Sequence, residues 1–324
     1  NPTLRCLHRG NSCTLVNMIH DFIYLLTAAV LRTMSFIPFH LGQRLGKIVG
    51  FLAYLIPFGR RTVALDNIRQ SSCGRNPNLS PRQLLRKVYM HFGQVLFEVP
   101  HILRLNEANF KRYFVIEGEE HLAQALKKGR GAFVLTGHFG NWELLSAAVT
   151  LRVGHTAVVV RPLDFAPMDR LISDLRTRFG TKIIPHNRGM RRILRAVKEN
   201  EAIGILLDQN VDWYQGEFVP FLGRPACTNK GLALMALKTG TPVVPAFSVR
   251  RKDGRYRIIV EEEVKVRRSG DKIGDLEENT AIFTRIIEKY VLAHPDHWFW
   301  FHKRWKTKNY CPIPWFLSGG STET

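Results

Sequence analysis

The sequence predicts an α/β fold in which a mostly parallel or mixed β-sheet is flanked by helices. Short apolar runs of strand length recur through the middle of the chain, and helix-like stretches lie between several of them. The chain has 324 residues, of which 45% are hydrophobic, so it can bury a sizeable core. Apolar strands that alternate with helices are typical of a sheet covered on both faces.

The N-terminal part differs from the rest of the chain. Residues 1–17 show no apolar periodicity, and we expect an unstructured extension there. Residues 18–60 are predicted to form a helical membrane-anchoring segment. Within them, residues 22–39 contain a single charge, Arg32, over close to the roughly 20 residues that cross a bilayer. Residues 48–59 form a second apolar stretch, short enough to be a buried or interfacial helix.

Charge supports the membrane interpretation of this segment. No acidic residue occurs between Asp21 and Asp66, whereas the same interval contains five basic residues, Arg32, Arg44, Lys47, Arg60 and Arg61. Apolar segments joined by purely basic connections suit an anionic membrane surface, with the positive side in the cytoplasm. The alternative is a helical hairpin within the core of a soluble domain.

The main body is expected over residues 61–311, followed by a small polar tail over 312–324. Residues 81–105 look helical. The strand-like runs after them are YFVIE, GAFVLTG, HTAVVVRP, KIIP, AIGILLDQ, PVVPAFSVR and RYRIIVEEEV, in chain order. Helix-like stretches between them include MRRILRAVKEN and KGLALMALKTG. This order indicates a single α/β domain.

The composition limits the partners and cofactors. Lys and Arg number 47 against 27 Asp and Glu, a formal charge of +20, which favours an anionic partner such as nucleic acid, an acidic protein or a membrane surface. The five cysteines are scattered and form no CxxC, so neither a disulfide framework nor a zinc site is expected. No GxGxxG or GxxxxGK[ST] motif is present, so no nucleotide cofactor is expected.

One stretch carries the pattern of a catalytic turn. The run GAFVLTG ends at His138, and Gly140, Asn141 and Glu143 follow. Chemistry in an α/β sheet sits beyond the carboxyl ends of the strands. Asn141 is predicted to be an N-cap, which places Glu143 in the first turn of the next helix. We therefore expect Glu143 to hold one imidazole nitrogen of His138 while the other acts as a general base on a hydroxyl.

A structural reading of these residues competes with the catalytic one. A histidine beside glycine is often a turn residue, and an acid in the first helical turn is ordinary complementarity to the helix dipole. The spacing is not HExxH, which disfavours a zinc protease.

Further motifs occur in a fixed order downstream. They are RP at 161–162, LLDQNVD at 206–212, FVPFLGRPACT at 218–228, GTPVVPAFSVR at 240–250 and HWFWFHKRWK at 297–306. Together with HFGNWE at 138–143, they resemble the lipid A biosynthesis acyltransferases, the late lauroyl/myristoyl transferases of Gram-negative bacteria. The resemblance covers residues from about 18 to 306. Where many relatives have two Phe before a Gly, this chain has Phe221, Leu222 and Gly223.

The resemblance implies a glycerolipid-acyltransferase-like fold and a His-x4-Glu motif at His138 and Glu143. It implies transfer of a fatty acyl group from acyl carrier protein to a hydroxyl of an anionic lipid A precursor, late in lipopolysaccharide biosynthesis, without a cofactor. The transfer would be direct, because the block contains no Ser or Cys nucleophile. It also implies a place on the cytoplasmic face of the inner membrane. Related enzymes acylate other lipids, so lysophospholipid and glycolipid acceptors remain alternatives.

Four more residues are candidates for binding the substrate or the oxyanion. Arg161 follows a strand and is expected to stabilise the oxyanion or to bind a phosphate of the acceptor, with a surface strand-end role as the alternative. Asp208 and Gln209 end another apolar strand and are expected at the same edge, where they position the acceptor or serve the structure alone. Asn141 is grouped with them.

Two basic segments are candidate docking surfaces. On a helix, Arg188, Arg191, Arg192 and Arg195 would form one stripe that binds acyl carrier protein or lipid phosphates, unless it is only a solvated face. The aromatic and basic run at 297–306 suits a membrane interface. A nucleic-acid-binding protein uses similar residues, but no RNA-binding or zinc-finger pattern is present, so no nucleic acid is expected. The remaining rival is a membrane tether without catalysis.

Overall fold

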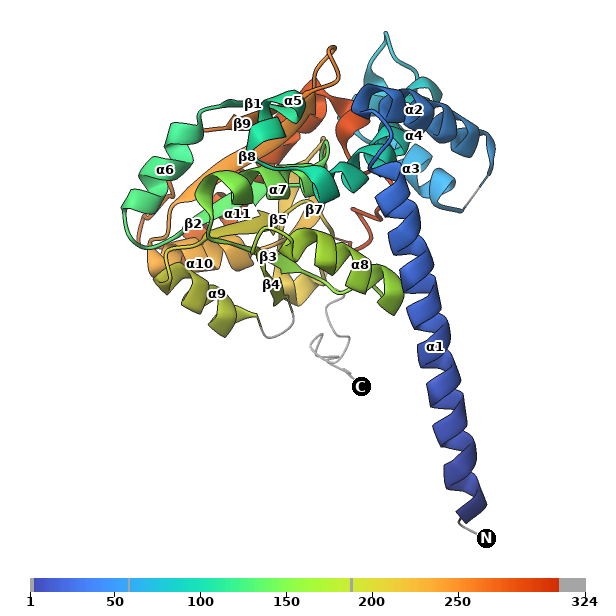
Figure 1. The fold of residues 1–324 in the computed structure, drawn as a ribbon. Coiled ribbons are helices and arrows are strands. Elements are labelled where there is room, and N and C mark those ends of the chain that lie inside the picture. Colours follow the sequence, from blue (N-terminus) through green and yellow to red (C-terminus); the bar gives the residue numbers. More distant parts are fainter. Residues whose placement is uncertain (1–2, 58, 187–188, 309–324) are drawn as a thin grey trace, which may run out of the picture.

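The computed structural model describes residues 3–57, 59–186 and 189–308. A seven-stranded sheet forms the centre of the molecule (Figure 1), with the strand order β1-β9-β8-β2-β5-β3-β4. Neighbouring strands are parallel except β8 and β9, which are antiparallel. The strands are β1 (Phe114–Glu117), β2 (Ala132–Thr136), β3 (Thr156–Val160), β4 (Lys182–Pro185), β5 (Ala202–Leu206), β8 (Val243–Arg250) and β9 (Tyr256–Val260). The predicted mixed sheet flanked by helices is confirmed.

Helices cover both faces of the sheet because its central strands are apolar on both sides. In β2, Phe133 and Leu135 belong to one hydrophobic cluster, and Ala132 and Val134 belong to a second. The first cluster includes α9 (Met190–Lys198), α10 (Gly231–Thr239) and α11 (Lys272–Ala293). The second includes α6 (Glu119–Lys127), α7 (Trp142–Val153) and α8 (Ala166–Thr177). Strands buried on both faces read as continuous apolar runs, which is why the sequence revealed them.

Among the described residues, four helices longer than ten residues precede the sheet, namely α1 (Thr3–Met34), α2 (Phe39–Leu55), α3 (Gly59–Gln70) and α4 (Pro81–Glu98). Short 3-10 helices at Ser72–Arg75, Val99–Arg104, Glu107–Asn109, Trp213–Gln215 and Pro295–His297, together with α5 (Phe110–Tyr113), form connections. Helices α2 and α4 cross closely, since a Cβ added at Gly46 would lie 2.4 Å from the carbonyl oxygen of Gly93. Helix α1 projects from the body and contacts α8 (Figure 1), where the hydroxyl of Tyr24 donates to Asp174 at 2.7 Å.

The structure corrects two expectations about the N-terminal part. Helix α1 begins at Thr3, so residues 3–17 are helical, because no proline lies between Pro2 and Pro38 to stop the helix. The apolar stretch 22–39 is divided between two helices, since α1 ends at Met34 and α2 begins at Phe39. Among the described residues, no single helix is long and apolar enough to cross a bilayer; only α2 and α3, bent by 93° to each other, meet that test as a pair.

A β-hairpin that was not among the strands predicted from the sequence lies beside the sheet. Its strands are β6 (Gly216–Phe221) and β7 (Arg224–Asn229). Leu222 and Gly223 form the two-residue turn with φ values of 51° and 78°, as expected for a turn with two left-handed residues. Leu222 tolerates this conformation because it is fully buried and its backbone amide donates to the carboxylate of Glu288 at 2.7 Å.

The polar tail at 312–324 lies outside the described residues.

Candidate active site

His138 lies in a tight turn between β2 and α7, as the sequence predicted. Gly140 in this turn has φ +60°, and a Cβ at that position would lie 1.9 Å from the carbonyl oxygen of Ser248. Only glycine fits such a conformation and such a close approach. The side chain of Asn141 accepts from the amide of Leu144 at 3.1 Å and so caps α7. The turn holds His138 at the carboxyl edge of the sheet.

The carboxylate that holds His138 is Asp208, which follows β5. Strand β5 pairs with β2 in register, Thr136 opposite Leu206, so the residues after both strands meet. The Nδ1 of His138 lies 2.8 Å from Oδ1 of Asp208, and the backbone amide of His138 donates to Oδ2 at 2.8 Å. Trp298 Nε1 also donates to Oδ2, at 2.7 Å. Asp208 is buried, whereas the His138 side chain is 23% exposed, so the imidazole is open to a substrate.

The surroundings of Asp208 determine the proton positions on His138. Burial alone would raise the pKa of the Asp208 carboxyl, but the charge and hydrogen bonds of His138 and the bond from Trp298 outweigh it and lower the pKa from 3.8 to about 2. An ionised carboxylate only accepts hydrogen bonds, so Nδ1 of His138 carries the proton and Nε2 keeps a lone pair. The side-chain amide of Gln209 donates to that Nε2 at 3.2 Å.

Glu143 does not contact His138, and this expectation was wrong. Its carboxylate accepts from both Nε and Nη2 of Arg176 on α8, at 2.9 and 2.5 Å, and from Trp142 Nε1 at 3.0 Å. In α7 it is Trp142, one residue earlier, whose ring lies beside the imidazole, with the centroids 5.1 Å apart. The first helical turn therefore directs Glu143 toward α8. Burial would lower the pKa of Arg176, yet the bond to Glu143 and its charge raise it.

Of the four candidates for binding the substrate or the oxyanion, only Gln209 contacts the exposed side of the imidazole. Asn141 is fully buried, and its side chain is taken up by Leu144 and Glu98, so it is no substrate ligand in this structure. Asp208 is likewise buried beneath His138. Arg161 follows β3 with a side chain that is 75% exposed, and it lies 3.6 Å from Asp164. Two strand spacings, roughly 10 Å, separate it from the strand of His138.

The basic stripe falls on α9, which connects β4 and β5. Arg191, Arg192 and Arg195 are exposed, while Ile193 and Val197 of the same helix are buried in the core. Arg188 lies outside the described residues. The stripe is thus a solvent-facing surface of the domain.

The aromatic run at 297–306 is mostly interior rather than a membrane interface, which corrects the sequence interpretation. Trp298, Trp300 and Arg304 are buried to 1% exposure or less. The guanidinium of Arg304 donates to the carbonyl oxygens of Gln209 and Cys227, at 3.2 and 2.7 Å, and to the hydroxyl of Thr228. Burial lowers the pKa of this guanidinium to about 10. Residues 298–304 thus hold Asp208 and Gln209, which follow β5. The spacing of Trp298 and Trp300, two residues apart, is typical of side chains that face the same buried side and could have indicated this role.

Aromatic rings line the approach to the imidazole. Phe299 lies 6.3 Å from His138 between ring centroids, and Phe92 of α4 lies 5.4 Å from Phe299. These rings and Trp142 are partly exposed. Within the described ranges, no group of three or more His, Cys, Asp or Glu side chains is arranged to hold a metal ion. The site therefore combines a supported histidine with an apolar approach.

Comparison with known proteins places the chain among acyltransferases. The family model described as bacterial lipid A biosynthesis acyltransferase matches residues 12–307. A lipid A biosynthesis acyltransferase of Haemophilus influenzae is 25% identical over 296 residues, 89% of this chain and 91% of the relative. A phosphatidylinositol mannoside acyltransferase of Mycobacterium tuberculosis is 24% identical over 238 residues, 72% of this chain and 73% of that protein.

Among solved structures, the 1-acyl-sn-glycerophosphate acyltransferase of Thermotoga maritima is 14% identical, with a TM-score of 0.35 over 75% of this chain and 96% of that one. The match of the family model to almost the whole chain decides the assignment. The chain is an O-acyltransferase and belongs to the bacterial lipid A biosynthesis acyltransferase family.

Proposed function

We propose that the protein transfers a fatty acyl chain from acyl carrier protein to a hydroxyl of a lipid A precursor, with His138 as the general base. The observation that carries this proposal is the imidazole of His138, bonded through Nδ1 to a buried carboxylate and exposed on its other side. A hydroxyl is a weak nucleophile at neutral pH, so a base must take its proton as it attacks.

The reaction follows from this geometry. The Nε2 of His138 accepts the proton of the acceptor hydroxyl while the oxygen attacks the thioester carbonyl carbon. The C–S bond of the tetrahedral intermediate then breaks, and the leaving sulfur takes the proton back from Nε2. Asp208 keeps its negative charge throughout and stabilises the imidazolium that forms between the two steps.

Gln209 has two successive roles in this mechanism. In the free enzyme its amide occupies Nε2 of His138, the position that the acceptor hydroxyl must take. When the acceptor enters, rotation of the side chain moves this amide, and its N–H groups become donors for the developing oxyanion. The backbone of Gln209 stays in place, because its carbonyl oxygen is held by the buried Arg304.

Glu143 is assigned to positioning Arg176 and Trp142, and Arg161 is assigned to substrate binding. Glu143 positions Arg176 by a bidentate ion pair and holds the indole of Trp142 beside His138. Arg161 is exposed at the edge where β3 ends, two strands from His138. We assign it to a phosphate of the acceptor, because a guanidinium binds phosphate in a planar, bidentate manner.

The exposed arginines of α9 are the proposed contact for the donor. Arg191, Arg192 and Arg195 present charge of one sign on one helix. Such a surface attracts an acidic carrier protein and increases the rate of encounter.

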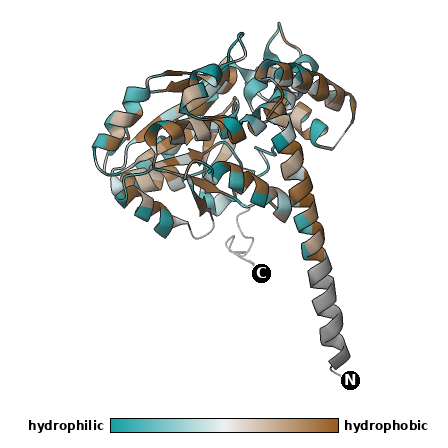
Figure 2. Cartoon of the chain, viewed as in Figure 1, coloured by the Kyte–Doolittle hydropathy of each residue, from teal (hydrophilic) through white to brown (hydrophobic). Residues whose placement is uncertain are grey.

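The proposed location is the cytoplasmic face of the inner membrane, with the protein lying on the surface. Helix α2 buries its glycine-rich side against α4, while its outer side exposes Ile48, Leu52 and Leu55 at 57%, 53% and 55%. Figure 2 shows the same apolar character along α2 and along the part of α1 that is coloured by hydropathy. Lys47 and Arg44 of α2 supply positive charge for anionic headgroups.

A different glycolipid is the second candidate acceptor. The relative named phosphatidylinositol mannoside acyltransferase supports this candidate, since its similarity extends over 72% of this chain. Both acceptors would present a hydroxyl to the same His138.

The test is an acyl-transfer assay with purified protein. Acyl carrier protein and coenzyme A thioesters of several chain lengths are incubated with a lipid A precursor, a lysophospholipid and a phosphatidylinositol mannoside, and the products are identified by mass spectrometry. We expect acylation of the lipid A precursor from the carrier protein, abolished in His138→Ala. Acylation of only the mannoside would favour the second candidate, and acylation of none would refute both.

A further inference from the structure

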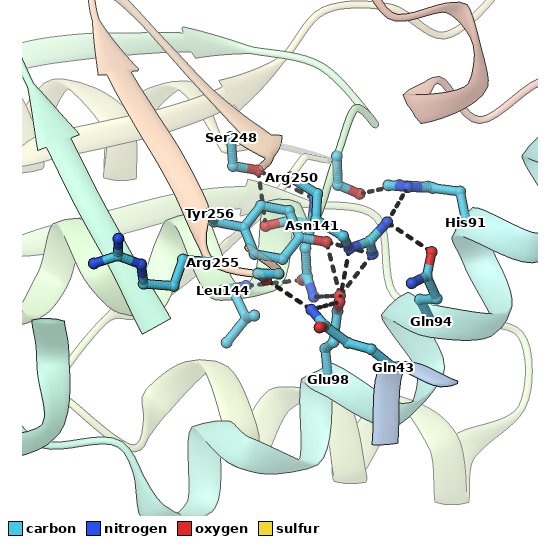
Figure 3. Close-up of polar contacts among 12 residues, drawn as sticks. Gln43, His91, Gln94, Glu98, Asn141, Leu144, Ser248, Arg250, Arg255 and Tyr256 are labelled. Carbon is cyan, nitrogen blue, oxygen red and sulfur yellow. Dashed lines mark hydrogen bonds and ion pairs between the residues drawn. The ribbon is translucent and has the colours of Figure 1, made fainter. Parts of the chain in front are cut away.

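A second polar cluster lies behind the catalytic turn, at the centre of Figure 3. Glu98, at the end of α4, is fully buried, and Arg250, at the end of β8, nearly so. They form a bidentate pair, with Nε to Oε1 at 2.8 Å and Nη2 to Oε2 at 2.9 Å. The carboxylate also accepts from the hydroxyl of Tyr256 at 2.7 Å and from the amide of Gln43 at 2.8 Å. Burying two charges is costly, and such a pair is weak evidence for stability alone.

One route from this pair reaches the catalytic turn directly. The side-chain amide nitrogen of Asn141 donates to Oε2 of Glu98 at 3.2 Å, while its oxygen caps α7. The backbone N–H of Asn141 donates to the hydroxyl of Ser248 at 3.1 Å. A carboxylate only accepts hydrogen bonds. Glu98 therefore fixes the orientation of the Asn141 side-chain amide, with its nitrogen toward the carboxylate and its oxygen toward α7. In this way Glu98 sets the position of Asn141, the residue that caps the N-terminus of α7.

A second route passes through His91 of α4. The Nη1 of Arg250 lies 2.7 Å from Nδ1 of His91, and Nε2 of His91 lies 3.2 Å from the carbonyl oxygen of Gly140. Arginine only donates, so Nδ1 accepts and the proton is on Nε2, which donates to Gly140. Burial, with His297 and Arg250 nearby, lowers the pKa of His91 well below 6.5, which keeps the ring neutral. Arg250 thereby fixes the tautomer that holds the glycine.

We infer that Glu98 and Arg250 form a positioning unit for the general base, acting through His91 and Asn141 on the turn that carries His138. The inference rests on the proposed role of His138. Every backbone N–H from His138 to Asn141 donates a hydrogen bond. Those of His138 and Asn141 donate to the side chains of Asp208 and Ser248. Those of Phe139 and Gly140 donate to the carbonyl oxygens of Gly137 and His297. Besides its bonds to Gln43, Gln94 and Tyr256, the buried pair contacts Asn141 and His91, the two side chains that bond to this turn or belong to it. A misplaced base loses rate even when substrates still bind.

Three substitutions test the unit without leaving a buried charge unpaired. Asn141→Ser keeps an N-cap hydroxyl that is too short to reach Glu98. His91→Leu removes the bond to Gly140, whereas His91→Gln places an amide donor at the same carbonyl. We expect kcat to fall about ten- to a hundredfold in Asn141→Ser and His91→Leu, with KM values changed less than about twofold. His91→Gln should retain most of the parental kcat.

Hydrogen exchange of the peptide over residues 137–145 provides a readout that needs no substrate. Exchange should be faster in Asn141→Ser and His91→Leu than in the parent. The control is Asn279→Ala on α11, which removes a buried amide bonded to the backbone of Arg267 and should lower Tm with unchanged kcat and unchanged exchange at 137–145.

The outcomes separate the two proposals. If Asn141→Ser and His91→Leu lower Tm as the control does but keep parental kcat and exchange, the pair is structural and the inference is overturned. If the parent acylates no acceptor, the proposed function fails. In that case faster exchange in the two variants still supports the link from the pair to the turn, and unchanged exchange rejects it.

Discussion

Replacement of Asp208 by Asn would remove a charge without changing the shape of the site. In the structure two fixed donors, the amide of His138 and the indole of Trp298, converge on Oδ2 of Asp208. The asparagine oxygen must take this place, because neither donor can reverse. The new NH2 group then faces Nδ1 of His138 and donates to it. Nε2 would carry the ring proton, which is the wrong tautomer for a general base.

The expected loss follows from this tautomer change. General-base assistance is worth about 10²–10⁴-fold in rate, which corresponds to about 3–5 kcal/mol of transition-state stabilisation. We therefore expect kcat of Asp208→Asn to fall by about that factor, with KM little changed. The carboxyl pKa of about 2, lowered from 3.8, indicates a further effect on the free energy of unfolding of about 2 kcal/mol.

Steady-state acyl transfer in detergent micelles, with saturating donor and acceptor, measures this loss. The matched control is Asp275→Asn on α11, which changes another buried carboxylate, bonded to Ser269 and Gly270. The control should keep the parental kcat. If folded Asp208→Asn works within about threefold of the parental rate, the carboxylate does not set the tautomer, and the reasoning about His138 is wrong.

The remaining predictions concern the base, the donor, the membrane and acid stability. His138→Ala should lose about 10²–10⁴-fold of kcat with an unchanged circular dichroism spectrum, and parental turnover would contradict the mechanism. Charge reversal of Arg191 and Arg192 should raise KM for acyl carrier protein, more at low salt than at high salt; a KM that stays constant at both would assign the stripe another role. Leu52→Asp should weaken cosedimentation with anionic vesicles roughly tenfold or more, and undiminished binding would exclude α2 as the contact. The free energy of unfolding should fall by about 2 kcal/mol as pH drops from about 4 to about 2, because in this range Asp208 is protonated in the unfolded chain and still ionised in the folded one. Asp208→Asn should lack this part of the acid sensitivity.

The sheet was readable from sequence because its strands are buried on both faces. All seven predicted runs correspond to strands, and the turn at His138 to Asn141 was recognised from its glycines and its N-cap. The hairpin β6–β7 was missed, because Pro220 and Pro225 argue against strands unless the pair lies outside a central sheet.

The partner of His138 was beyond a local reading. Glu143 is five residues away in sequence, whereas Asp208 is seventy residues away and meets the imidazole only because β2 and β5 pair in register. The short spacing between His138 and the start of the next helix suggested Glu143. The pairing of β2 with β5 instead brings Asp208 to the imidazole. The support from Trp298 and Arg304 likewise depends on a tertiary contact with a later segment.

That contact has a consequence for the order in which the enzyme becomes active. During synthesis the histidine, its carboxylate and the sheet leave the ribosome well before residues 298–304. Until those residues arrive, Asp208 lacks the indole donor, and the carbonyl of Gln209 lacks its guanidinium. A nascent chain is therefore expected to stay catalytically silent, and removal of this short segment by a protease would inactivate a finished molecule. Residues 298–304 thus complete the site after its other side chains have been synthesised.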